Sequence, residues 1–373
     1  MSRHKKKGTA TIIVLLFLLC NVLAVLGLLF AYSSLFISPE KWWLPAFAGL
    51  TYPYIALLNL IFVLGWLFIK PKYIWLSLIA LLAGFFIGNR YIQLNYTDEF
   101  HRTENHIKIL SYNSQMFNLN QRFGEENTEK LSRNINMLHN INADIICLQE
   151  AFIKNRYSEL IPAQIADHLS MPYYTYKSYR EGYTGGLAIV SKYRIINKDK
   201  ILCNDRTIAL YADILLNKDT CRLYNFHLES TYLGHQEAYV VDSFGSNFYQ
   251  DSLYLSRSRL VAGKLKRAYI ARAIQAEILR KHIDTSPYRV IIVGDLNDPP
   301  CSFSYQKLRK GHYDAFIKAG RGMSKTYNGK YPSFRIDYIF YDKAFKSVDY
   351  VVIKKGTSDH FPIYAILEKR GEK

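Results

Sequence analysis

The sequence is poor in cysteine and contains no C-x-x-C pair. Only five cysteines occur in 373 residues. Structural zinc sites are usually built from closely spaced cysteine pairs, so such a site is improbable here. Four of the five, Cys147, Cys203, Cys221 and Cys301, lie in the second part of the chain. If that part is exported, one disulfide among them remains open.

Charge is absent from three long stretches in the first quarter of the chain. No charged residue occurs in 9–37, 44–69 or 73–88. A helix rises 1.5 Å per residue, so the first two stretches are long enough to cross a hydrocarbon layer of about 30 Å. The third needs residues 89–94 to extend it. The sequence therefore predicts three transmembrane helices at about 9–37, 44–69 and 73–94.

A cleaved signal peptide is the alternative for the first stretch, because basic residues 3–7 precede it. Its apolar run is about twice as long as the apolar region of a usual signal peptide. Two further apolar stretches follow almost at once. This pattern favours a lasting membrane anchor over a removed segment.

Basic residues near the apolar stretches predict an orientation. Lysines occupy 5–7 before the first stretch, and Lys70 and Lys72 lie between the second and third. The connection between the first and second stretches carries only Glu40 and Lys41 as charged residues. Because loops rich in Lys and Arg stay in the cytoplasm, we expect a cytoplasmic N-terminus. Three crossings would then place the rest of the multi-pass protein on the extracytoplasmic side, in the periplasm if the source is bacterial.

Acidic residues are scarce relative to basic ones. From residue 101 onward there are 40 Lys and Arg against 28 Asp and Glu, an excess of 12 positive charges. Such a surface suits an anionic partner: a phosphate, a nucleic acid or an acidic lipid headgroup. It is equally compatible with a merely basic, soluble surface.

The chain has no internal repeat and no low-complexity tract. We divide it into a membrane region at 1–88, a polar linker without regular structure at 89–105, and a soluble domain at 106–373. Helical periodicity is found at 125–140 and 256–283. Apolar runs typical of buried strands occur at 107–112, 144–149, 186–191, 222–228, 288–294, 335–341 and 362–367. Strands interleaved with helices predict a layered α/β domain.

One of these strands ends in polar residues. VIIVGDLNDPP, residues 290–300, runs from buried strand into Asp295 and Asn297, two positions apart. Ligands gather at strand ends in α/β sheets, and side chains two residues apart point to the same side. A hard cation or a polarised water suits this pair. A simple Asx turn, with Asp298 shaping the turn, is the alternative.

Other strands also carry polar side chains at their ends or in their interior. A carboxylate in an apolar strand, such as RIDYIF, is costly to bury unless a cation or a histidine pairs with it. So many strand termini with carboxylates, amides and imidazoles predict one shared site. Its further candidates are Asn113, Glu150, His227, Asp337, Asp359 and His360.

These motifs occur in the order N…QE…G-x-A-x-x-S…N-x-H-L…G-D-x-N-D…R-I-D-Y-I…S-D-H. In this the chain resembles the endonuclease/exonuclease/phosphatase superfamily, which includes deoxyribonuclease I and neutral sphingomyelinases. The resemblance covers roughly residues 106–369. It implies a four-layered α/β sandwich with two central mixed sheets and a divalent-metal phosphoesterase site.

For the metal, the resemblance implies Mg²⁺, with Mn²⁺ as a possible substitute. Glu150 would be the principal ligand, with Asn113 and Asp359 nearby. One position departs from the pattern of abasic-site endonucleases, which place an acidic residue two positions after the first asparagine, where this chain has Gln115. Two-metal schemes that use that carboxylate are therefore in doubt.

For catalysis, the resemblance implies that Asp295 and Asn297 orient or deprotonate the attacking water. His360 paired with Asp337 would form an acid–base dyad that also stabilises the phosphate. His227 would hydrogen-bond the scissile phosphate. Whether Asp295 or His360 accepts the proton stays open.

Together these observations predict a membrane-anchored, metal-dependent phosphoesterase that hydrolyses phosphodiester or phosphomonoester bonds by water attack. Its substrate would be a nucleic acid or a phospholipid headgroup, and the lipid bilayer would be its partner through three helices. The alternative from another class is a catalytically silent binding or scaffold protein that keeps the fold. The natural substrate, endo or exo action, the oligomeric state and protein partners are not decided by the sequence.

Overall fold

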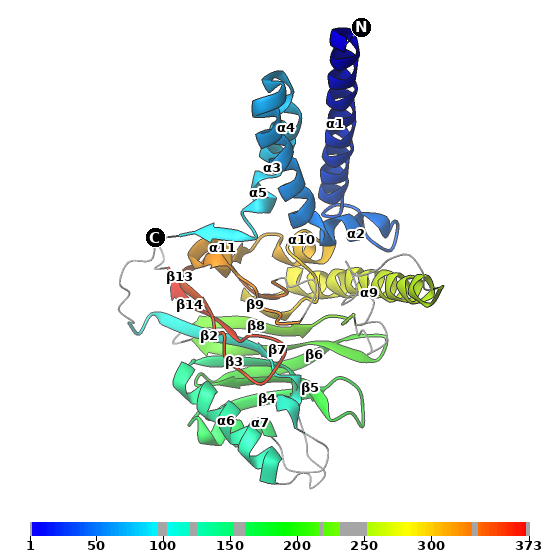
Figure 1. Ribbon diagram of the computed structural model, residues 1–373. Coiled ribbons are helices and arrows are strands. Elements are labelled where there is room, and N and C mark those ends of the chain that lie inside the picture. The colour runs from blue at the N-terminus through cyan, green and yellow to red at the C-terminus, as the bar shows by residue number, and fades with distance from the viewer. Residues whose placement is uncertain are drawn as a thin grey trace.

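The computed structural model describes residues 2–95, 103–119, 125–152, 161–216, 219–231, 252–329 and 335–370. It has two regions. The N-terminal helices project from one side of a body built around two β-sheets (Figure 1). We call the described residues 2–91 the helical region and those from 103 onward the sandwich.

The helical region contains α1 (Ser2–Ser33), α2 (Leu44–Leu50), α3 (Tyr52–Ile69), a 3-10 turn (Pro71–Tyr73), α4 (Ile74–Ala83) and α5 (Phe85–Gly88). The helices of the sandwich are α6 (Glu125–Ile141), α7 (Ile161–His168), α9 (Ser252–Asp284), α10 (Phe303–Arg309) and α11 (Ala315–Ala319), with a further 3-10 turn (Gln115–Asn118). The helical periodicity at 125–140 and 256–283 thus corresponds to α6 and α9.

Two helices in the described residues are long and apolar enough to cross a membrane, Thr11–Ser33 and Tyr52–Ile69. The predicted third span, 73–94, is not one continuous helix, because α4 ends at Ala83 and only the short α5 follows. At this break Gly84 lies against the Tyr32 ring, and a Cβ there would lie 1.9 Å from the Tyr32 hydroxyl. The predicted second span is also divided, since α2 ends at Leu50 and α3 begins at Tyr52, with Pro53 in its first turn.

The predicted linker, 89–105, is partly structured. Residues 92–94 form β1 (Ile92–Leu94), which pairs antiparallel with β11 (Arg321–Met323). Asn95 donates hydrogen bonds to the carbonyl oxygens of Ile317 (3.2 Å) and Gly320 (3.0 Å). Residues 89–95 are therefore docked on the sandwich, while 96–102 lie outside the described residues.

Two six-stranded mixed sheets form the centre of the sandwich. One has the order β13-β14-β2-β3-β5-β4 and the other β10-β12-β9-β8-β7-β6. The strands of the first are β2 (His106–Asn113), β3 (Ile145–Phe152), β4 (Tyr173–Ser178), β5 (Gly185–Ser191), β13 (Phe345–Val352) and β14 (Ile363–Lys369). Those of the second are β6 (Ile195–Cys203), β7 (Arg206–Leu216), β8 (Asp219–His227), β9 (Arg289–Asp295), β10 (Tyr313–Asp314) and β12 (Asp337–Tyr341).

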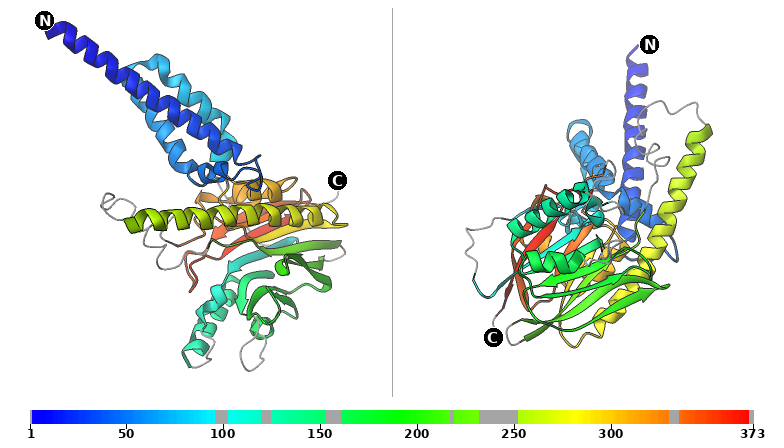
Figure 2. Two further views of the ribbon diagram at one scale, coloured as in Figure 1. Left: turned by 90° about the vertical axis from the view of Figure 1, so that its right-hand side faces the viewer. Right: turned by 90° about the horizontal axis from the view of Figure 1, so that it is seen from below.

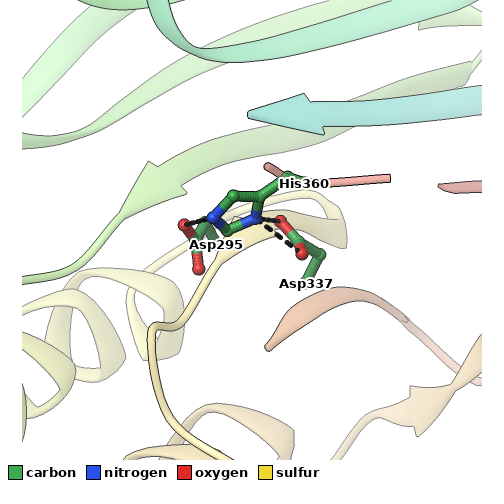
Figure 3. Close-up of side chains that lie close together, drawn as sticks. All are labelled: Asp295, Asp337 and His360. Carbon is green, nitrogen blue, oxygen red and sulfur yellow. Dashed lines mark hydrogen bonds and ion pairs between the residues drawn. The ribbon is translucent and has the colours of Figure 1, made fainter. Parts of the chain in front are cut away.

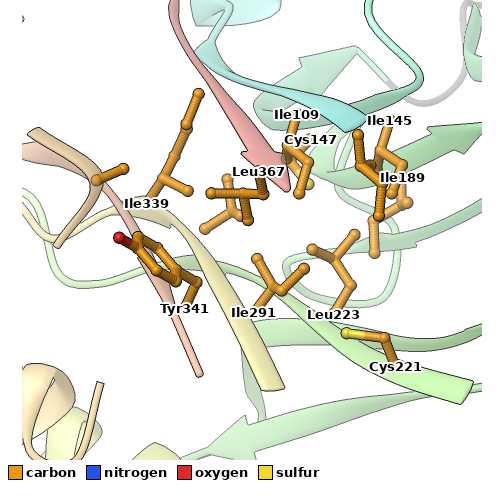
Figure 4. Close-up of a cluster of buried hydrophobic side chains, with 14 of the residues drawn as sticks. Ile109, Ile145, Cys147, Ile189, Cys221, Leu223, Ile291, Ile339, Tyr341 and Leu367 are labelled. Atoms are coloured by element: carbon orange, nitrogen blue, oxygen red, sulfur yellow. The ribbon is translucent and has the colours of Figure 1, made fainter. Parts of the chain in front are cut away.

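The main hydrophobic core lies between the two sheets (Figure 4). Ile109, Ile145 and Ile189 from one sheet face Leu223 and Ile291 from the other, and all are buried. Alternate side chains on the outer faces pack against helices: α6 and α7 cover one sheet, and α9 and α10 cover the other (Figure 2). The four-layered α/β sandwich with two mixed sheets is confirmed.

Candidate active site

Three adjacent strands bring site residues into a row. β8 runs parallel to β9 and pairs His227 with Asp295, while β12 runs antiparallel to β9 and pairs Asp337 with Asp295. The strands can approach this closely because residue 294 is glycine, with φ of +152°, and a Cβ there would lie 2.0 Å from the carbonyl oxygen of Phe226. The sheet itself therefore fixes the spacing of two carboxylates and an imidazole.

His360 approaches this row from the segment that precedes β14. Its Nδ1 lies 3.0 and 3.2 Å from the two carboxylate oxygens of Asp337. On the other side of the ring, Nε2 lies 3.7 Å from Oδ2 of Asp295 (Figure 3). Asp337 is buried and orients the ring, so the predicted dyad of His360 and Asp337 exists in the structure. The side chain of Asp295 therefore lies on the opposite side of the His360 ring from Asp337.

The charges in this cluster oppose each other. Burial lowers the pKa of His360, but the carboxylates of Asp337 and Asp295 outweigh it and raise the pKa to about 10. Burial, and then the charge of Asp337, raise the pKa of Asp295 to about 7. Near neutral pH an imidazolium therefore stands beside a carboxyl group that gains and loses its proton readily, which suits acid–base chemistry.

The other sheet, which contains β2 and β3, contributes Asn113 and Glu150 from the ends of these two strands. The pairing of β3 with β5 shifts register between Leu148 and Ala151, and Glu150 has a φ of +46°. This bulge turns the Glu150 carboxylate toward the site. The Asn113 amide nitrogen lies 3.3 Å from Glu150 Oε1 and 3.0 Å from Asp295 Oδ2, so it links the two sheets at the site. Burial raises the pKa of Glu150, which a bound cation would counteract.

His227 is held by a residue that the sequence analysis did not select, Tyr179. The Tyr179 hydroxyl accepts the backbone N–H of Glu150 at 2.9 Å and lies 2.6 Å from His227 Nδ1. The hydroxyl proton is therefore free to go to Nδ1. Burial lowers the pKa of His227 well below its usual value, so the ring is neutral and carries its proton on Nε2.

That Nε2 is aimed into the site. It lies 3.6 Å from both Glu150 Oε1 and Asp295 Oδ2 and has no hydrogen-bond partner among the described residues. A buried N–H without a partner is costly, so a ligand oxygen is the natural acceptor. This geometry fits the predicted role of His227 as a phosphate donor.

The two remaining predicted residues stand at the edge of the cluster. Asp359 is tied to it through Ser358, whose hydroxyl lies 2.8 Å from the Asn113 carbonyl oxygen and 3.3 Å from Asp359 Oδ1. Asn297 has a φ of +53°, and its backbone N–H donates to Asp295 Oδ1 at 2.8 Å. The Asx turn expected as an alternative is therefore present, and it belongs to the same site.

The set of donor atoms fits a hard divalent cation. Glu150, Asp295 and Asp359 supply carboxylate oxygens, the ligands that such ions prefer. Asp295, Asp337 and His360 also form a compact group whose ligand atoms lie within 4.8 Å of one another. An imidazolium has no lone pair for a metal, so the protonated His360 favours the side of the site occupied by Glu150. Asn113 turns its amide nitrogen to the carboxylates here and would have to present its oxygen to bind a cation.

A further pair crosses between the sheets beneath the site and was also missed. Gln149 donates to Asn225 Oδ1 at 2.7 Å, and Asn225 donates to the Leu148 carbonyl oxygen at 2.9 Å. Both side chains are fully buried. Each residue lies within an apolar run, DIICLQE or RLYNFHL, and belongs to the motif QE or N-x-H-L, but no role was predicted for either.

One solved structure agrees with this fold, and others are similar to the chain at lower TM-scores. A protein described as endonuclease/exonuclease/phosphatase from Beutenbergia cavernae DSM 12333 is similar at 15% identity over 71% of this chain and 72% of that chain, with a TM-score of 0.51. A family protein from Leptotrichia buccalis C-1013-b matches at 17% identity over 70% and 99%, with a TM-score of 0.49. A mannosyl-6-phosphatase from Bacteroides thetaiotaomicron VPI-5482 matches at 17% identity over 70% and 99%, with a TM-score of 0.45. No curated protein is similar to the chain at a significant level.

Two family models match separate parts of the sequence. A model described as a domain of unknown function (DUF8431) matches residues 14–91, which correspond to the helical region. The model of the Endonuclease/Exonuclease/phosphatase family matches residues 110–360, more than half of the chain and every candidate site residue. The chain therefore belongs to the Endonuclease/Exonuclease/phosphatase family.

Proposed function

We propose that this protein is a membrane-anchored, divalent-metal-dependent phosphoesterase, with Mg²⁺ as its metal and Mn²⁺ as a substitute. The observation that carries the proposal is the buried dyad of His360 and Asp337 beside Asp295. It faces the Glu150 carboxylate and the unpartnered Nε2 of His227. Family membership supports phosphoester hydrolysis in general.

The side chains divide the work as follows. Glu150, with Asp359 and Asn113 beside it, would hold the cation, which when bound supplies positive charge to the phosphate oxygens. His227 donates its Nε2–H to a nonbridging oxygen. His360 places an imidazolium where negative charge accumulates during water attack.

The attacking water is the remaining part of the reaction. Asp295, with a pKa of about 7, can accept its proton, and Asn297 lies beside it to orient the water. His360 can donate a proton to the leaving oxygen or accept one from water in its neutral form. The raised pKa of His360, about 10, favours Asp295 as the acceptor, because the ring is then already protonated at neutral pH.

Hydrolysis of bis-p-nitrophenyl phosphate by the purified full-length protein tests this proposal. We expect turnover with Mg²⁺, loss of turnover in EDTA, and loss in the variant His360→Ala. The matched control is His168→Ala, since His168 is exposed on α7, away from the cluster. Undiminished turnover in EDTA would refute metal dependence.

Metal binding is tested separately from turnover. Glu150→Gln keeps the size of the side chain and removes its charge, so we expect Mg²⁺ affinity to fall at least about 10-fold by isothermal titration calorimetry, since even loss of a residue that only supports a metal ligand costs about 10- to 100-fold. Asp349→Asn is a control on β13, outside the cluster. Unchanged Mg²⁺ binding in Glu150→Gln, or no binding to the wild type, would instead support the catalytically silent scaffold.

Membrane anchoring rests on the surface of the helical region. Only 17% of the best window in Thr11–Ser33 and 22% of that in Tyr52–Ile69 is buried, whereas the core helix of a soluble protein is mostly buried. The start of α1 and the turn between α3 and α4 lie at the end farthest from the sheets (Figure 1). With the N-terminus and the sandwich at opposite ends of the helices, the basic residues 5–7, 70 and 72 lead us to propose a cytoplasmic N-terminus and an extracytoplasmic sandwich. A reporter enzyme fused after residue 370 should be active only outside the cytoplasm.

The substrate is proposed to be a nucleic acid or a phospholipid headgroup. One observation favours the lipid: Cys301, six residues after Asp295, is buried against the helical region. Six residues span at most about 20 Å, so the site lies near the bilayer if the helices cross it. Hydrolysis of phospholipid vesicles compared with plasmid DNA, both with the full-length protein and Mg²⁺, would decide between them.

A further inference from the structure

The loop that follows the catalytic strand β9 ends inside the helical region. Cys301 is 1% exposed and belongs to a hydrophobic cluster whose other buried members all come from the helical region. These are Leu28, Ala31, Leu35, Tyr52, Ala80 and Ile87. A loop that begins with Asp295 and Asn297 is thus anchored at its far end by the apolar helices.

The backbone of Cys301 is held from three directions. Its N–H donates to the Tyr91 hydroxyl at 3.1 Å, and its carbonyl oxygen accepts from the Ser34 hydroxyl at 3.1 Å. At Gly49 in α2, a Cβ would lie 2.3 Å from the same carbonyl oxygen. Only glycine permits this approach. Ser34, Gly49 and Tyr91 of the helical region thus form a close-fitting contact site for Cys301.

Arg90, just after α5, connects two segments of the site. Its guanidinium donates to the Pro300 carbonyl oxygen at 3.1 Å and to Gln306 at 2.9 Å. Its own carbonyl oxygen accepts from Arg335 at 3.0 Å, two residues before Asp337. Arg90 is 6% exposed, so these bonds are made away from water. One residue of the helical region therefore contacts both the loop after Asp295 and the segment before Asp337.

The middle of the loop is fixed by the sandwich. Asp298 pairs with Arg272 of α9 at 3.0 Å, and its carbonyl oxygen accepts from the Tyr338 hydroxyl at 2.9 Å. Arg272 also donates to the Glu229 carbonyl oxygen at 2.9 Å, two residues after His227. The loop is consequently held by α9 and β12 at its centre and by the helical region at its end.

We propose that the helical region is a positioning element of the active site and that Arg90 is its positioning residue. By holding Pro300 and Cys301, it sets where Asp295 and Asn297 stand relative to the dyad. A displacement of about 1 Å in catalytic groups can cost about 100-fold in rate. The inference rests on the proposed phosphoesterase activity, and it gives the helices a role beyond attachment to a membrane.

The test uses the full-length protein in detergent with Mg²⁺ and bis-p-nitrophenyl phosphate. We expect Arg90→Met to lower kcat at least tenfold while KM changes less than threefold. Arg90→Lys should recover part of the loss, because an ammonium can still donate to the Pro300 carbonyl oxygen. Gly49→Ala disturbs the contact between α2 and the Cys301 carbonyl oxygen and should also lower kcat, although every residue of the sandwich is unchanged.

Arg222→Met is the matched control. Arg222 is also a buried arginine, paired with Asp213 at 2.6 Å, but it lies at the end of β8 opposite to His227. We expect its loss to lower thermal stability and to leave kcat of the folded protein within twofold. This comparison separates positioning from a general loss of stability.

Hydrogen exchange of residues 296–301 gives a readout that does not depend on turnover. We expect faster exchange there in Arg90→Met and Gly49→Ala than in Arg222→Met. The inference would be overturned if Arg90→Met and Gly49→Ala both had the kcat of the wild type, or if their loss of kcat were no larger than that of Arg222→Met. A wild-type protein without any turnover would refute the proposed function instead, so the two failures are distinguishable.

Discussion

The two regions of this protein have opposite arrangements of polar and apolar side chains. In the sandwich, Ile291, Leu223 and their neighbours are buried between sheets. In the helical region, Leu60 and Ile61 of α3 are about half exposed, whereas Asn21 and Asn59 are fully buried. Burial of apolar surface away from water stabilises the first. The second is the arrangement that the proposed membrane anchoring would require, because the surroundings of such helices are themselves apolar.

The two regions also differ in the kinds of polar group that they bury. The sandwich concentrates Asp295, Asp337 and His360 in a space where each is at most 5% exposed. Burying one such charged group alone is unfavourable. It is tolerated here because the positive charge of His360 is paired with the carboxylates beside it. The helical region, in contrast, buries uncharged amides and hydroxyls among its helices, and its buried Arg90 faces the sandwich. The proposed catalytic groups therefore lie in the sandwich. Substitutions in the sandwich should mainly lower activity or core stability, whereas those inside the helical region should have smaller effects on stability.

The largest effect is expected for Asp337→Asn. The amide keeps the size of the side chain but cannot hold His360 as an imidazolium in the same orientation. In hydrolase triads the corresponding change costs about 10⁴-fold in kcat, and we expect a loss of about 10³-fold or more. Steady-state kinetics with Mg²⁺ measures it. A loss below tenfold, with a folded protein, would contradict the role of the dyad.

A large loss of stability without direct damage to the site is expected for Ile291→Ala. Ile291 is 1% exposed in the core between the sheets, four residues before Asp295. The cavity should lower the free energy of unfolding by about 2–5 kcal/mol. Thermal or denaturant unfolding in detergent measures this. Leu260→Ala is the control, because Leu260 is 58% exposed on α9 and should change stability by less than about 0.5 kcal/mol.

The pH dependence of kcat/KM should be set by titrating groups of the sandwich alone. Asp295 must lose its proton to act as base, so kcat/KM should rise as the pH increases through its pKa of about 7. His360 must keep its proton, so kcat/KM should fall as the pH increases toward 10. The result is a bell-shaped profile, and a bound cation would move the acidic limb lower because it favours the carboxylate.

The effect on each limb is about tenfold per pH unit outside the optimum. Asp295→Asn should remove the acidic limb from whatever activity remains. A profile that is flat between pH 6 and 10 would contradict this assignment of the two groups. A profile that changes with Arg222→Met would show that stability, and not the site, determines its shape.

Much of the fold was predictable because its central strands are apolar throughout. β2, β3, β5, β8, β9, β12 and β14 correspond to the seven predicted runs. The strands β4, β6, β7 and β13 were missed. β4, β6 and β13 lie at sheet edges and contain exposed polar residues, such as INKDK in β6. Such patterns look the same as those of polar loops. β7 is an inner strand, and its apolar run is interrupted by Asp213.

Residues of the site were likewise predictable only where the signal lies in the neighbouring sequence. Asp295 and Glu150 end apolar runs and are visible in the sequence. Tyr179 is not, because its partner His227 lies 48 positions away and the neighbouring Tyr183 looks equally suitable. In the structure Tyr183 is 64% exposed. Arg90 was assigned to a linker for the same reason, since Pro300 is 210 positions distant.

The smallest effect is expected in the interior of the helical region. Asn59 donates to the Ala24 carbonyl oxygen at 3.0 Å and accepts from the Ser77 hydroxyl at 2.9 Å, which joins α1, α3 and α4. Asn59→Ala should cost about 0.6–2 kcal/mol, because hydrogen bonds between helices in apolar surroundings are modest in net strength. Thermal unfolding in detergent measures it. Leu60→Ala, on the exposed face, should cost less, and if it cost more than Asn59→Ala the helical region would be packed against another surface through that face.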